Sequence, residues 1–229
     1  APEGFTPHQL MMTATPIPRT LAMTLYADLS SSVIDEYPPN RIPITTSVIS
    51  DKARDKVIER VKAQCQEGTQ VYWVCTLIEE SEQLPAKAAE MAYADLCEKL
   101  PHLRIGLIHG RLKSAEKESV MNAFKAHELD ILVATTVIEV GVDVPNASIM
   151  IIENAERLGL SQLHQLRGRV GRGSKASFCL LLYSPPLSHM TRERLEIMQL
   201  TNDGFEIAEK DFELRGAGDI FGTRQTGEF

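Results

Sequence analysis

Short apolar runs alternate with segments of helical periodicity along most of this chain. The runs, which are rich in β-branched residues, predict strands at 44–49, 70–76, 104–108, 130–134, 147–152 and 178–183. Apolar residues that recur every three or four positions predict helices between them, at 51–66, 81–100 and 114–126. Strands that are apolar on both faces and separated by helices are typical of a parallel sheet with helices on both faces. The sequence therefore predicts an α/β fold of this kind.

The first 40 residues show little periodic structure. They contain one short helix candidate, 19–29, and they end at the turn Pro38-Pro39-Asn40, which is typical of a linker. Because the chain begins at Ala1 without an initiator methionine, we expect it to be a fragment of a longer protein.

The segment after Pro185-Pro186 is helical again. Its pattern predicts two helices, 189–200 and 205–214, as an appended helical hairpin, and a glycine-rich tail follows at 216–227. The chain therefore divides into three parts, which are residues 1–40, 41–184 and 185–229.

The composition excludes several classes of protein. The net charge of −7 over 229 residues argues against a protein that coats nucleic acid non-specifically. The four cysteines form no C-x-x-C pair and the six histidines are dispersed, so we expect no zinc knuckle, no disulfide framework and no metal site. The sequence shows no secretion signal and no apolar run of membrane-spanning length, and we therefore expect a cytoplasmic protein.

A cationic cluster at 162–172 stands out on this acidic background, because the stretch 159–175 holds four Lys or Arg residues and no acidic one. At helical spacing Gln162, Gln165, Arg169 and Arg172 would share one face. Guanidinium groups held as a fork suit bidentate contact with phosphate oxygens. The neighbouring face carries apolar residues that can anchor the segment to a core, Leu163, Leu166 and Val170.

The glycines of this cluster, Gly168 and Gly171, allow a close approach of backbone or ligand, and we expect them to end the helix. The alternative interpretation of the cluster is a surface helix end with a solvated basic turn.

Polar residues also follow the other predicted strands. They lie at 76–81, at His109-Gly110-Arg111 and at 135–145, and the arginine cluster follows the next strand. Because the carboxyl ends of parallel strands meet at one edge of a sheet, we expect all of these residues to converge there.

Two of these loops carry groups suited to a nucleotide or a nucleic-acid backbone. Thr135 and Thr136 offer hydroxyls and amides to phosphate oxygens. Asp143, between Gly141 and Pro145, could accept from a ribose hydroxyl or from the arginine fork, and a purely structural cap on that fork is an equal alternative. The chain has no G-x-x-x-x-G-K-[ST] phosphate loop and no acidic strand end for magnesium. The arginine fork would therefore form one half of a phosphate-binding site, and we expect the other half to lie elsewhere.

Three segments together resemble superfamily 2 helicases. Met12 to Arg19 resembles motif III of that superfamily, Val133 to Pro145 resembles motif V, and Gln162 to Arg172 resembles motif VI. The tail from Asp211 to Gly227 resembles the translocation motif found after motif VI in the RecG family and in transcription-repair coupling factors. The segments most similar to the RecG family are 74–81, 154–160 and 222–227.

This resemblance implies a place for the chain in a larger motor. Such helicases have two RecA-like lobes with ATP between them, and the first lobe carries the phosphate loop and the Mg²⁺ ligands. Residues 1–40 would be the tail of the first lobe with the linker, 41–184 the RecA-like second lobe, and 185–229 the helical hairpin with the translocation motif.

The resemblance also implies roles for individual residues. Catalysis would rest on Arg169 and Arg172, which would reach the γ-phosphate as arginine fingers, with Gln165 orienting them. ATP would further contact Gly141 and Asp143. The DNA backbone would be bound by Thr135, Thr136, Thr76, His109 and Gly110. Hydrolysis would be coupled to movement by Thr13, Thr15, Arg215, Arg224 and Gln225.

The function implied is that of the second motor lobe of an ATP-dependent DNA helicase. The whole protein would use ATP and Mg²⁺ to translocate on duplex DNA and to remodel stalled forks and Holliday junctions. Its partners would be branched or duplex DNA and, in the same long chain, the first motor lobe and a wedge domain. Two alternatives stay open: the motor of a transcription-repair coupling factor, and a nucleic-acid-binding module without turnover. We expect the 229 residues alone to be inactive.

Overall fold

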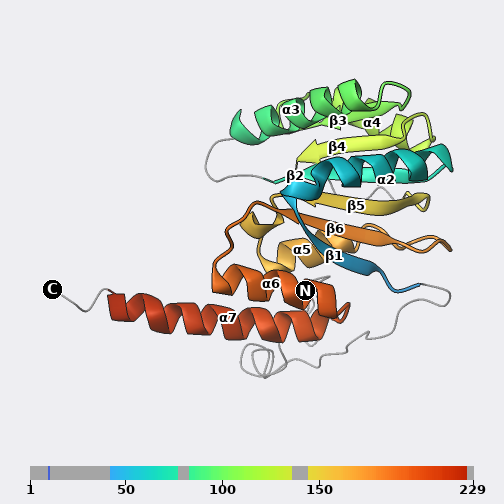
Figure 1. The fold of residues 1–229 in the computed structure, drawn as a ribbon. Helices are drawn as coiled ribbons and strands as arrows, with labels where there is room; N and C mark the ends of the chain where they lie inside the picture. The colour runs from blue at the N-terminus through green and yellow to red at the C-terminus, as the bar shows by residue number, and fades with distance from the viewer. Residues whose placement is uncertain (1–9, 11–41, 77–82, 136–143, 226–229) are drawn as a thin grey trace, which may run out of the picture.

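The six strands of the described residues form one parallel sheet. The computed structural model describes residue 10 and residues 42–76, 83–135 and 144–225, with backbone alone for 83–85 and 217–225. The sheet has the strand order β1-β6-β5-β2-β4-β3 (Figure 1). The strands are β1 (Thr45–Ser50), β2 (Gln70–Cys75), β3 (Ile105–Ile108), β4 (Ile131–Thr135), β5 (Ala147–Glu153) and β6 (Phe178–Tyr183).

Helices cover both faces of this sheet, which confirms the predicted fold class. One face is covered by α2 (Arg54–Gln66), which the turn η1 (Asp51–Ala53) precedes, and by α3 (Gln83–Lys99). The other side holds α4 (Ser114–Lys125), α5 (Leu160–Arg167), which follows η2 (Ala155–Arg157), and α6 (His189–Leu200). Helix α7 (Gly204–Gln225) packs on α5 and α6 outside them.

The central strand β2 explains why the sequence shows continuous apolar runs rather than alternation. All six of its residues are buried, because it lies between β5 and β4 and under helices on both faces. Trp73 points to the α2/α3 side, and Tyr72 points to the opposite side, where its ring meets Phe124 of α4 edge-on at 5.1 Å between centroids.

The hairpin differs from the sequence-based prediction at one end. Helix α6 spans the predicted residues, but α7 continues to Gln225, so the prediction of a helix ending at Leu214 with a glycine-rich tail was wrong. Glycine lowers helix stability by about 1 kcal/mol per residue relative to alanine without forbidding the helix. Residues 204–225 contain no proline that would break it. The predicted helix 19–29 lies outside the described residues.

Two helices extend beyond the carboxyl ends of the strands, on opposite sides of the sheet. Helix α3 extends there on one side, and α7, which contacts both α5 and α6, extends there on the other (Figure 1). The carboxyl edge of the sheet is therefore flanked by a projecting helix on each side.

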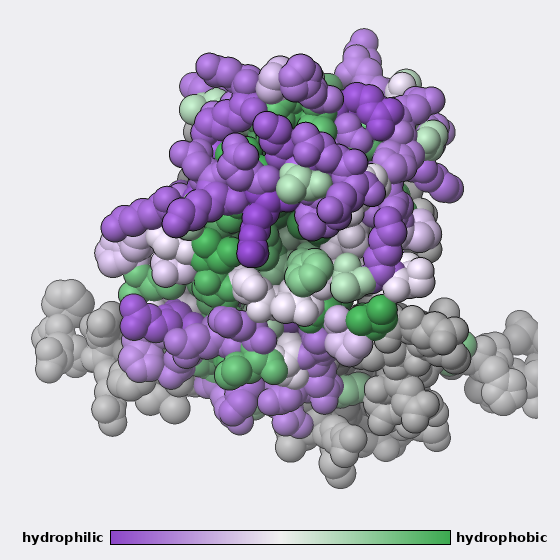
Figure 2. Space-filling view, turned by 45° about the vertical axis from the view of Figure 1, so that its right-hand side comes forward, coloured by the Kyte–Doolittle hydropathy of each residue, from purple (hydrophilic) through white to green (hydrophobic). Residues whose placement is uncertain are grey.

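The coloured part of the face in Figure 2 is mostly hydrophilic, with an apolar band across its middle. Helices α2 and α3 pack mainly on β2, β3 and β4, so the strand β6 is incompletely covered on their side. Its residues on that side range from the buried Leu182 to Phe178, which is 42% exposed.

An ion pair fixes the start of β4 at the amino edge of the sheet. The Asp130 carboxylate accepts from the Arg104 backbone N–H at 2.9 Å and from the Arg104 guanidinium at 3.1 and 3.3 Å. Burial pushes the pKa of Asp130 up, but the hydrogen bonds from Arg104 and the charge of His127 outweigh it and hold this pKa below its ordinary value. The charged form of Asp130 therefore stabilises the folded state.

The lowered pKa of Asp130 predicts a loss of stability in acid. The contribution is complete above the unfolded pKa of about 3.9 and disappears as the pH falls through the lower folded value. We expect Asp130→Asn to lower the stability at pH 7 by about 2 kcal/mol, or about 4–8 °C in Tm. This difference should shrink towards pH 3, which thermal melts of both proteins from pH 3 to 7 would measure. A difference that stays constant over this range would contradict the assignment.

Candidate functional site

Three predicted site residues lie together at the carboxyl edge of the sheet. Thr135 ends β4, Thr76 follows β2, and His109 follows β3, so they mark the ends of three neighbouring strands. All three residues are buried, and the exposed Gly110 comes directly after His109. The structure thus brings these residues to one edge, as the sequence predicts for them.

Both nitrogens of the His109 ring have partners within the protein. Nδ1 accepts from the backbone N–H of Arg111 at 3.2 Å, and Nε2 lies 3.2 Å from the carboxylate of Glu90 on α3. The acceptor role of Nδ1 places the ring proton on Nε2. The imidazole therefore orients the turn after β3, in which Gly110 and Arg111 are both exposed to a ligand.

A hydrogen-bond hub that the sequence analysis missed lies next to Thr76. The Thr76 hydroxyl donates to the carbonyl of Asn154 at 3.2 Å. The Asn154 amide in turn donates to Glu156 at 3.2 Å and to the Ser184 hydroxyl at 3.1 Å, and that hydroxyl donates to Asp51 at 2.6 Å. Asn154 has a left-handed backbone (φ 52°), which asparagine tolerates better than most residues. An asparagine directly after a predicted strand was the sequence feature that could have indicated this hub.

This hub marks the point at which the chain changes sides of the sheet. The helix after β2 is α3, on one face, whereas the helix after the neighbouring strand β5 is α5, on the other. Ligands of open parallel sheets bind at such a switch point, outside the carboxyl ends of the strands. The contact of Thr76 with Asn154 therefore lies where this fold is suited to bind a ligand.

The arginine cluster takes a different shape from the predicted helical face. Helix α5 ends at Arg167, and Gly168 caps it, so Arg169 and Arg172 lie beyond the helix and do not share a helical face with Gln162 and Gln165. The expected end of the helix at the glycines is confirmed. The apolar anchors are buried as predicted, namely Leu163, Leu166 and Val170.

The end of the cluster also lies at the opposite edge of the sheet from Thr76 and Thr135. Gly171 packs on Ile44, which precedes β1, and Gly173 packs on Pro145, which precedes β5. The expectation that all loops converge at the carboxyl edge was therefore wrong for Arg172. The reason is that α5 runs back along the sheet, so that the chain after it reaches the start of β6 (Figure 1).

The backbone of Arg172 is fixed on both sides. Gly171 has φ +79°, and a Cβ there would lie 2.9 Å from the Ile44 side chain. A Cβ on Gly173 would lie 2.5 Å from the carbonyl oxygen of Pro145. The exposed Arg172 side chain donates from Nε to the carbonyl of Gly168 at 3.3 Å. The sequence Gly-Arg-Gly thus presents a guanidinium on a rigid turn.

Arg169 is half-buried next to Arg172. Burial lowers the pKa of Arg169 from its ordinary value, the Tyr72 hydroxyl opposes this, and the positive charge of Arg172 adds to the lowering. Arginine stays protonated nonetheless. The positive charge of Arg172 disfavours the charged form of Arg169, and an anion bound beside Arg169 would offset this. Gln165 is exposed on the preceding turn of α5.

The third arginine of the cluster, Arg167, is buried and structural, a role that the sequence analysis did not predict. Its Nη1 donates to the Thr46 hydroxyl at 3.2 Å and to the Met198 carbonyl at 2.6 Å. It therefore joins α5 to β1 and to the last turn of α6, and a charged residue in this role carries no clear sequence signal.

The remaining predicted residues are only partly described. Thr13, Thr15, Thr136, Gly141 and Asp143 lie outside the described residues. The backbones of Arg224 and Gln225 belong to α7. The exposed Arg215 pairs with Asp211 on the same helix at 3.4 Å.

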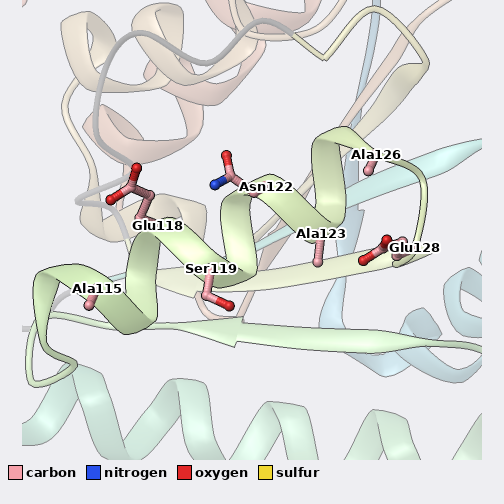
Figure 3. Close-up of a pocket in the computed structure, with 7 residues that line it drawn as sticks. All are labelled: Ala115, Glu118, Ser119, Asn122, Ala123, Ala126 and Glu128. Atoms are coloured by element: carbon pink, nitrogen blue, oxygen red, sulfur yellow. The ribbon is translucent and has the colours of Figure 1, made fainter.

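A hollow of about 560 Å³ runs along α4 and contains none of these residues. Figure 3 shows its lining of mostly small side chains, including Ala115, Ser119 and Ala123. Over the ranges 42–76, 83–135 and 144–225, no three His, Cys, Asp or Glu residues are placed to hold a metal ion. No helix in these ranges is long and apolar enough to span a membrane.

Comparison with known proteins identifies the class. Residues 45–174 match the family model of the helicase conserved C-terminal domain, so the chain belongs to that family. Residues 201–229 match the model described as "ATP-dependent DNA helicase RecG, domain 3, C-terminal". The sequence-based resemblance to superfamily 2 helicases and to the RecG family is thereby confirmed.

The similar curated proteins are ATP-dependent DNA helicases RecG. That of Pasteurella multocida is 67% identical over 96% of this chain and 32% of its own length. That of Escherichia coli K12 is 65% identical over 98% of this chain, and that of Bacillus subtilis 50% over 98%, each over 33% of its own length. The chain thus spans about a third of the length of these relatives.

Solved structures agree with this family. A RecG bound to a three-way DNA junction is 44% identical, with a TM-score of 0.75 over 90% of this chain and 27% of that one. Domain 2 of the DEAD-box helicase Mss116p, 20% identical with a TM-score of 0.53 over 70% of this chain and 62% of that one, shares the fold.

The glycines that flank Arg172 should not tolerate a side chain. In Gly171→Ala the alanine must adopt the left-handed backbone of this position, which costs roughly 1–2 kcal/mol, and its Cβ displaces Ile44. In Gly173→Ala the Cβ clashes with the Pro145 backbone. We expect each variant to lower the Tm of the chain by at least about 3 °C in thermal melts. Gly110→Ala is the matched control, because a Cβ there meets no atom within 4 Å. Unchanged melting of Gly173→Ala would contradict the close approach to Pro145.

Proposed function

We propose that this chain is the second motor lobe of an ATP-dependent DNA helicase that translocates on duplex DNA and remodels branched DNA. The observation that carries the proposal is the family match together with two polar surfaces at opposite ends of the strands. The similar proteins are named RecG, which favours this function over the motor of a transcription-repair coupling factor.

The carboxyl edge is proposed to bind the DNA backbone. Thr76, Gly110 and Thr135 stand at the ends of β2, β3 and β4, with Thr136 next along the chain. Hydroxyls and backbone amides are typical phosphate donors, and such contacts carry little sequence information. The Thr76 hydroxyl already donates to the Asn154 carbonyl, so Thr76 would act by placing the end of β2. His109 would act by holding the turn at Gly110, because its own ring nitrogens are occupied. Binding should therefore be salt-sensitive and largely independent of sequence.

The turn around Arg172 is proposed to bind the nucleotide. Arg169 and Arg172 are two cations on a rigid turn and fit the phosphates of ATP, with Gln165 beside them. Guanidinium groups in this position would stabilise the charge that develops on the transferred phosphoryl group. In this proposal Gly141 and Asp143 also contact the nucleotide, which the resemblance of Val133 to Pro145 to helicase motif V supports.

The Mg²⁺ ligands are assigned to the first motor lobe. The described ranges hold no carboxylate cluster of metal-binding geometry, so the proposal routes no step through Mg²⁺ in this chain. When bound, Mg²⁺ would neutralise charge on the β- and γ-phosphates. The first lobe would face the arginine turn, and residues 1–40 would be its tail and linker.

Coupling between the two surfaces is assigned to the parts that run between them. Strand β4 ends at Thr135, at the carboxyl edge, and β5 begins at Ala147, at the amino edge. Helix α7 packs beside α5 and extends past the carboxyl edge, carrying Arg215, Arg224 and Gln225 (Figure 1). Thr13 and Thr15 would contribute to this coupling from the first lobe. The division into 1–40, 41–184 and 185–229 and a cytoplasmic location are part of this proposal.

The arginine assignment predicts loss of turnover without loss of DNA binding. In the full-length protein we expect strong stimulation of ATP hydrolysis by forked DNA, and less by linear duplex or single strands. Arg172→Ala should lower kcat by about 10³-fold or more and leave DNA affinity unchanged. Arg192→Ala, which removes an exposed arginine of α6, is the control. If the unaltered protein shows no DNA-stimulated hydrolysis, the binding-module alternative replaces this proposal.

The 229 residues alone should not hydrolyse ATP. They contain no phosphate loop, so the nucleotide would meet only the arginine side of its site. ATPase assays of the purified chain with and without forked DNA check this, with the full-length protein as the positive control. DNA-stimulated turnover by the chain alone would contradict the assignment of the phosphate loop to the first lobe.

A further inference from the structure

Arg54 is the centre of a charged cluster on the α2/α3 side of the sheet, outside the predicted site residues. It is the first residue of α2, and its side chain is 20% exposed. Its Nε donates to Glu153 at 2.6 Å and its Nη1 to Asp95 of α3 at 2.6 Å. The guanidinium also lies over the Trp73 ring, 5.3 Å from its centroid. One side chain thus joins α2, α3, β2 and β5.

Glu153 connects this cluster to the carboxyl edge. It is the last residue of β5 and pairs in register with Cys75 of β2. Its Oε2 accepts from the Trp73 indole at 2.8 Å, and the Cys75 sulfur lies 3.9 Å away. Asn154 follows Glu153, Thr76 follows Cys75, and the Thr76 hydroxyl donates to the Asn154 carbonyl. The ends of β2 and β5 are therefore tied together by the Glu153 side chain and by the Thr76 hydroxyl.

The cluster remains charged at neutral pH. Burial lowers the pKa of Arg54, but the hydrogen bonds and charges of Glu153 and Asp95 outweigh this and raise it above its ordinary value. Burial raises the pKa of Asp95, but Arg54 and Lys99 outweigh it and lower this pKa. Partly buried ion pairs of this kind are often no more stabilising than apolar residues of similar volume. Stability alone is therefore a weak explanation for a charged residue at this position.

The position of Glu153 suggests a different role for Arg54. The carboxylate lies at the switch point of the sheet, one residue from Asn154 and across from Thr76. If a polyanion binds this edge, an uncompensated carboxylate beneath it would repel the phosphates. The positive charge of Arg54 compensates that carboxylate, and the contacts of Arg54 also fix the ends of β2 and β5.

We propose that Arg54 is a positioning residue of the DNA-binding edge, which neutralises Glu153 and holds the ends of β2 and β5 in register beneath the bound backbone. The proposal rests on the proposed function of this edge. Arg54 does not contact DNA itself in this scheme; it acts through Glu153 and through the placement of Thr76.

The chain offers a matched control for this role. Lys99 forms a similar link between the same two helices, to Asp55 at 2.9 Å and to Asp95 at 3.3 Å. It makes no contact with Glu153 among the interactions of the described residues, and its partner Asp55 is 83% exposed. Removing Lys99 therefore weakens the α2–α3 link without leaving a carboxylate unpaired at the end of β5.

The test is the affinity of the full-length protein for labelled forked DNA, measured by fluorescence anisotropy at several salt concentrations. We expect Arg54→Met to raise the Kd about five- to tenfold at low salt. The double variant Arg54→Met/Glu153→Gln should return to within about threefold of the unaltered protein, and Lys99→Met should stay within about twofold. The defect of Arg54→Met should shrink as salt increases, because salt screens the repulsion.

Several outcomes would overturn the proposal. One is an unchanged Kd of Arg54→Met with a lower Tm, which would leave Arg54 a purely structural residue. Another is a double variant that binds as weakly as Arg54→Met, because the unpaired charge would then not be the cause. Arg54→Lys covers the case in which Arg54→Met does not fold. It keeps the charge but not the fork, so we expect a rise in Kd of roughly two- to threefold from the altered placement of the strand ends, with little dependence on salt; no rise would contradict the proposal.

Direct binding keeps this test separate from the motor function. The Kd values do not depend on ATP hydrolysis, so they can be interpreted even if the full-length protein proves to be a binding module. Failure of the motor proposal would appear as absent hydrolysis with the Kd pattern intact. Failure of the Arg54 proposal would appear as an altered Kd pattern with hydrolysis intact.

Discussion

The register of β2 against β5 is the constraint on which both candidate surfaces depend. Side chains alternate between the faces of a strand, so a slip of one residue would exchange the faces of Trp73 and Tyr72. Trp73 would lose its contact with Glu153, and Tyr72 would leave Phe124. Thr76 would no longer meet the carbonyl of Asn154. Burial of β2 on both faces enforces this register, and the polar contacts at the carboxyl end of β2 form only in this register.

A parallel sheet also separates the two candidate surfaces. Thr76 and Thr135 stand at the carboxyl ends of their strands, whereas Gly171 and Gly173 fix Arg172 against residues that precede β1 and β5. Six residues of strand span about 20 Å. If the nucleotide binds at the Arg172 turn as proposed, a change there would reach the carboxyl edge through neighbouring elements such as α5 and α7, which pack on each other. This separation suits a motor that exchanges one ligand while it holds another.

The strands and most helices could be predicted because burial on both faces gives a strong pattern, and the predicted β6 and α6 match the structure at both ends. The errors have physical causes. Glycines in α7 weaken a helix without ending it, and a helix that returns along the sheet carries Arg172 away from the carboxyl edge. Pairings over long distances in sequence, such as Arg54 with Glu153 or Arg167 with Met198, leave no periodic pattern to find.

The three arginines of the cluster show how environment assigns different roles to one residue type. Arg167 is desolvated and donates hydrogen bonds to Thr46 and Met198, so it holds α5 in place. Arg172 is exposed on a turn that two glycines fix, so its charge is available to a ligand at little cost in ordering. Arg169 lies between these extremes, partly desolvated and near a second positive charge. Removing water from such a pair raises its affinity for an anion, because the anion replaces the lost solvation. The same principle applies at the other edge with the sign reversed, where Arg54 compensates the carboxylate of Glu153 before any ligand arrives.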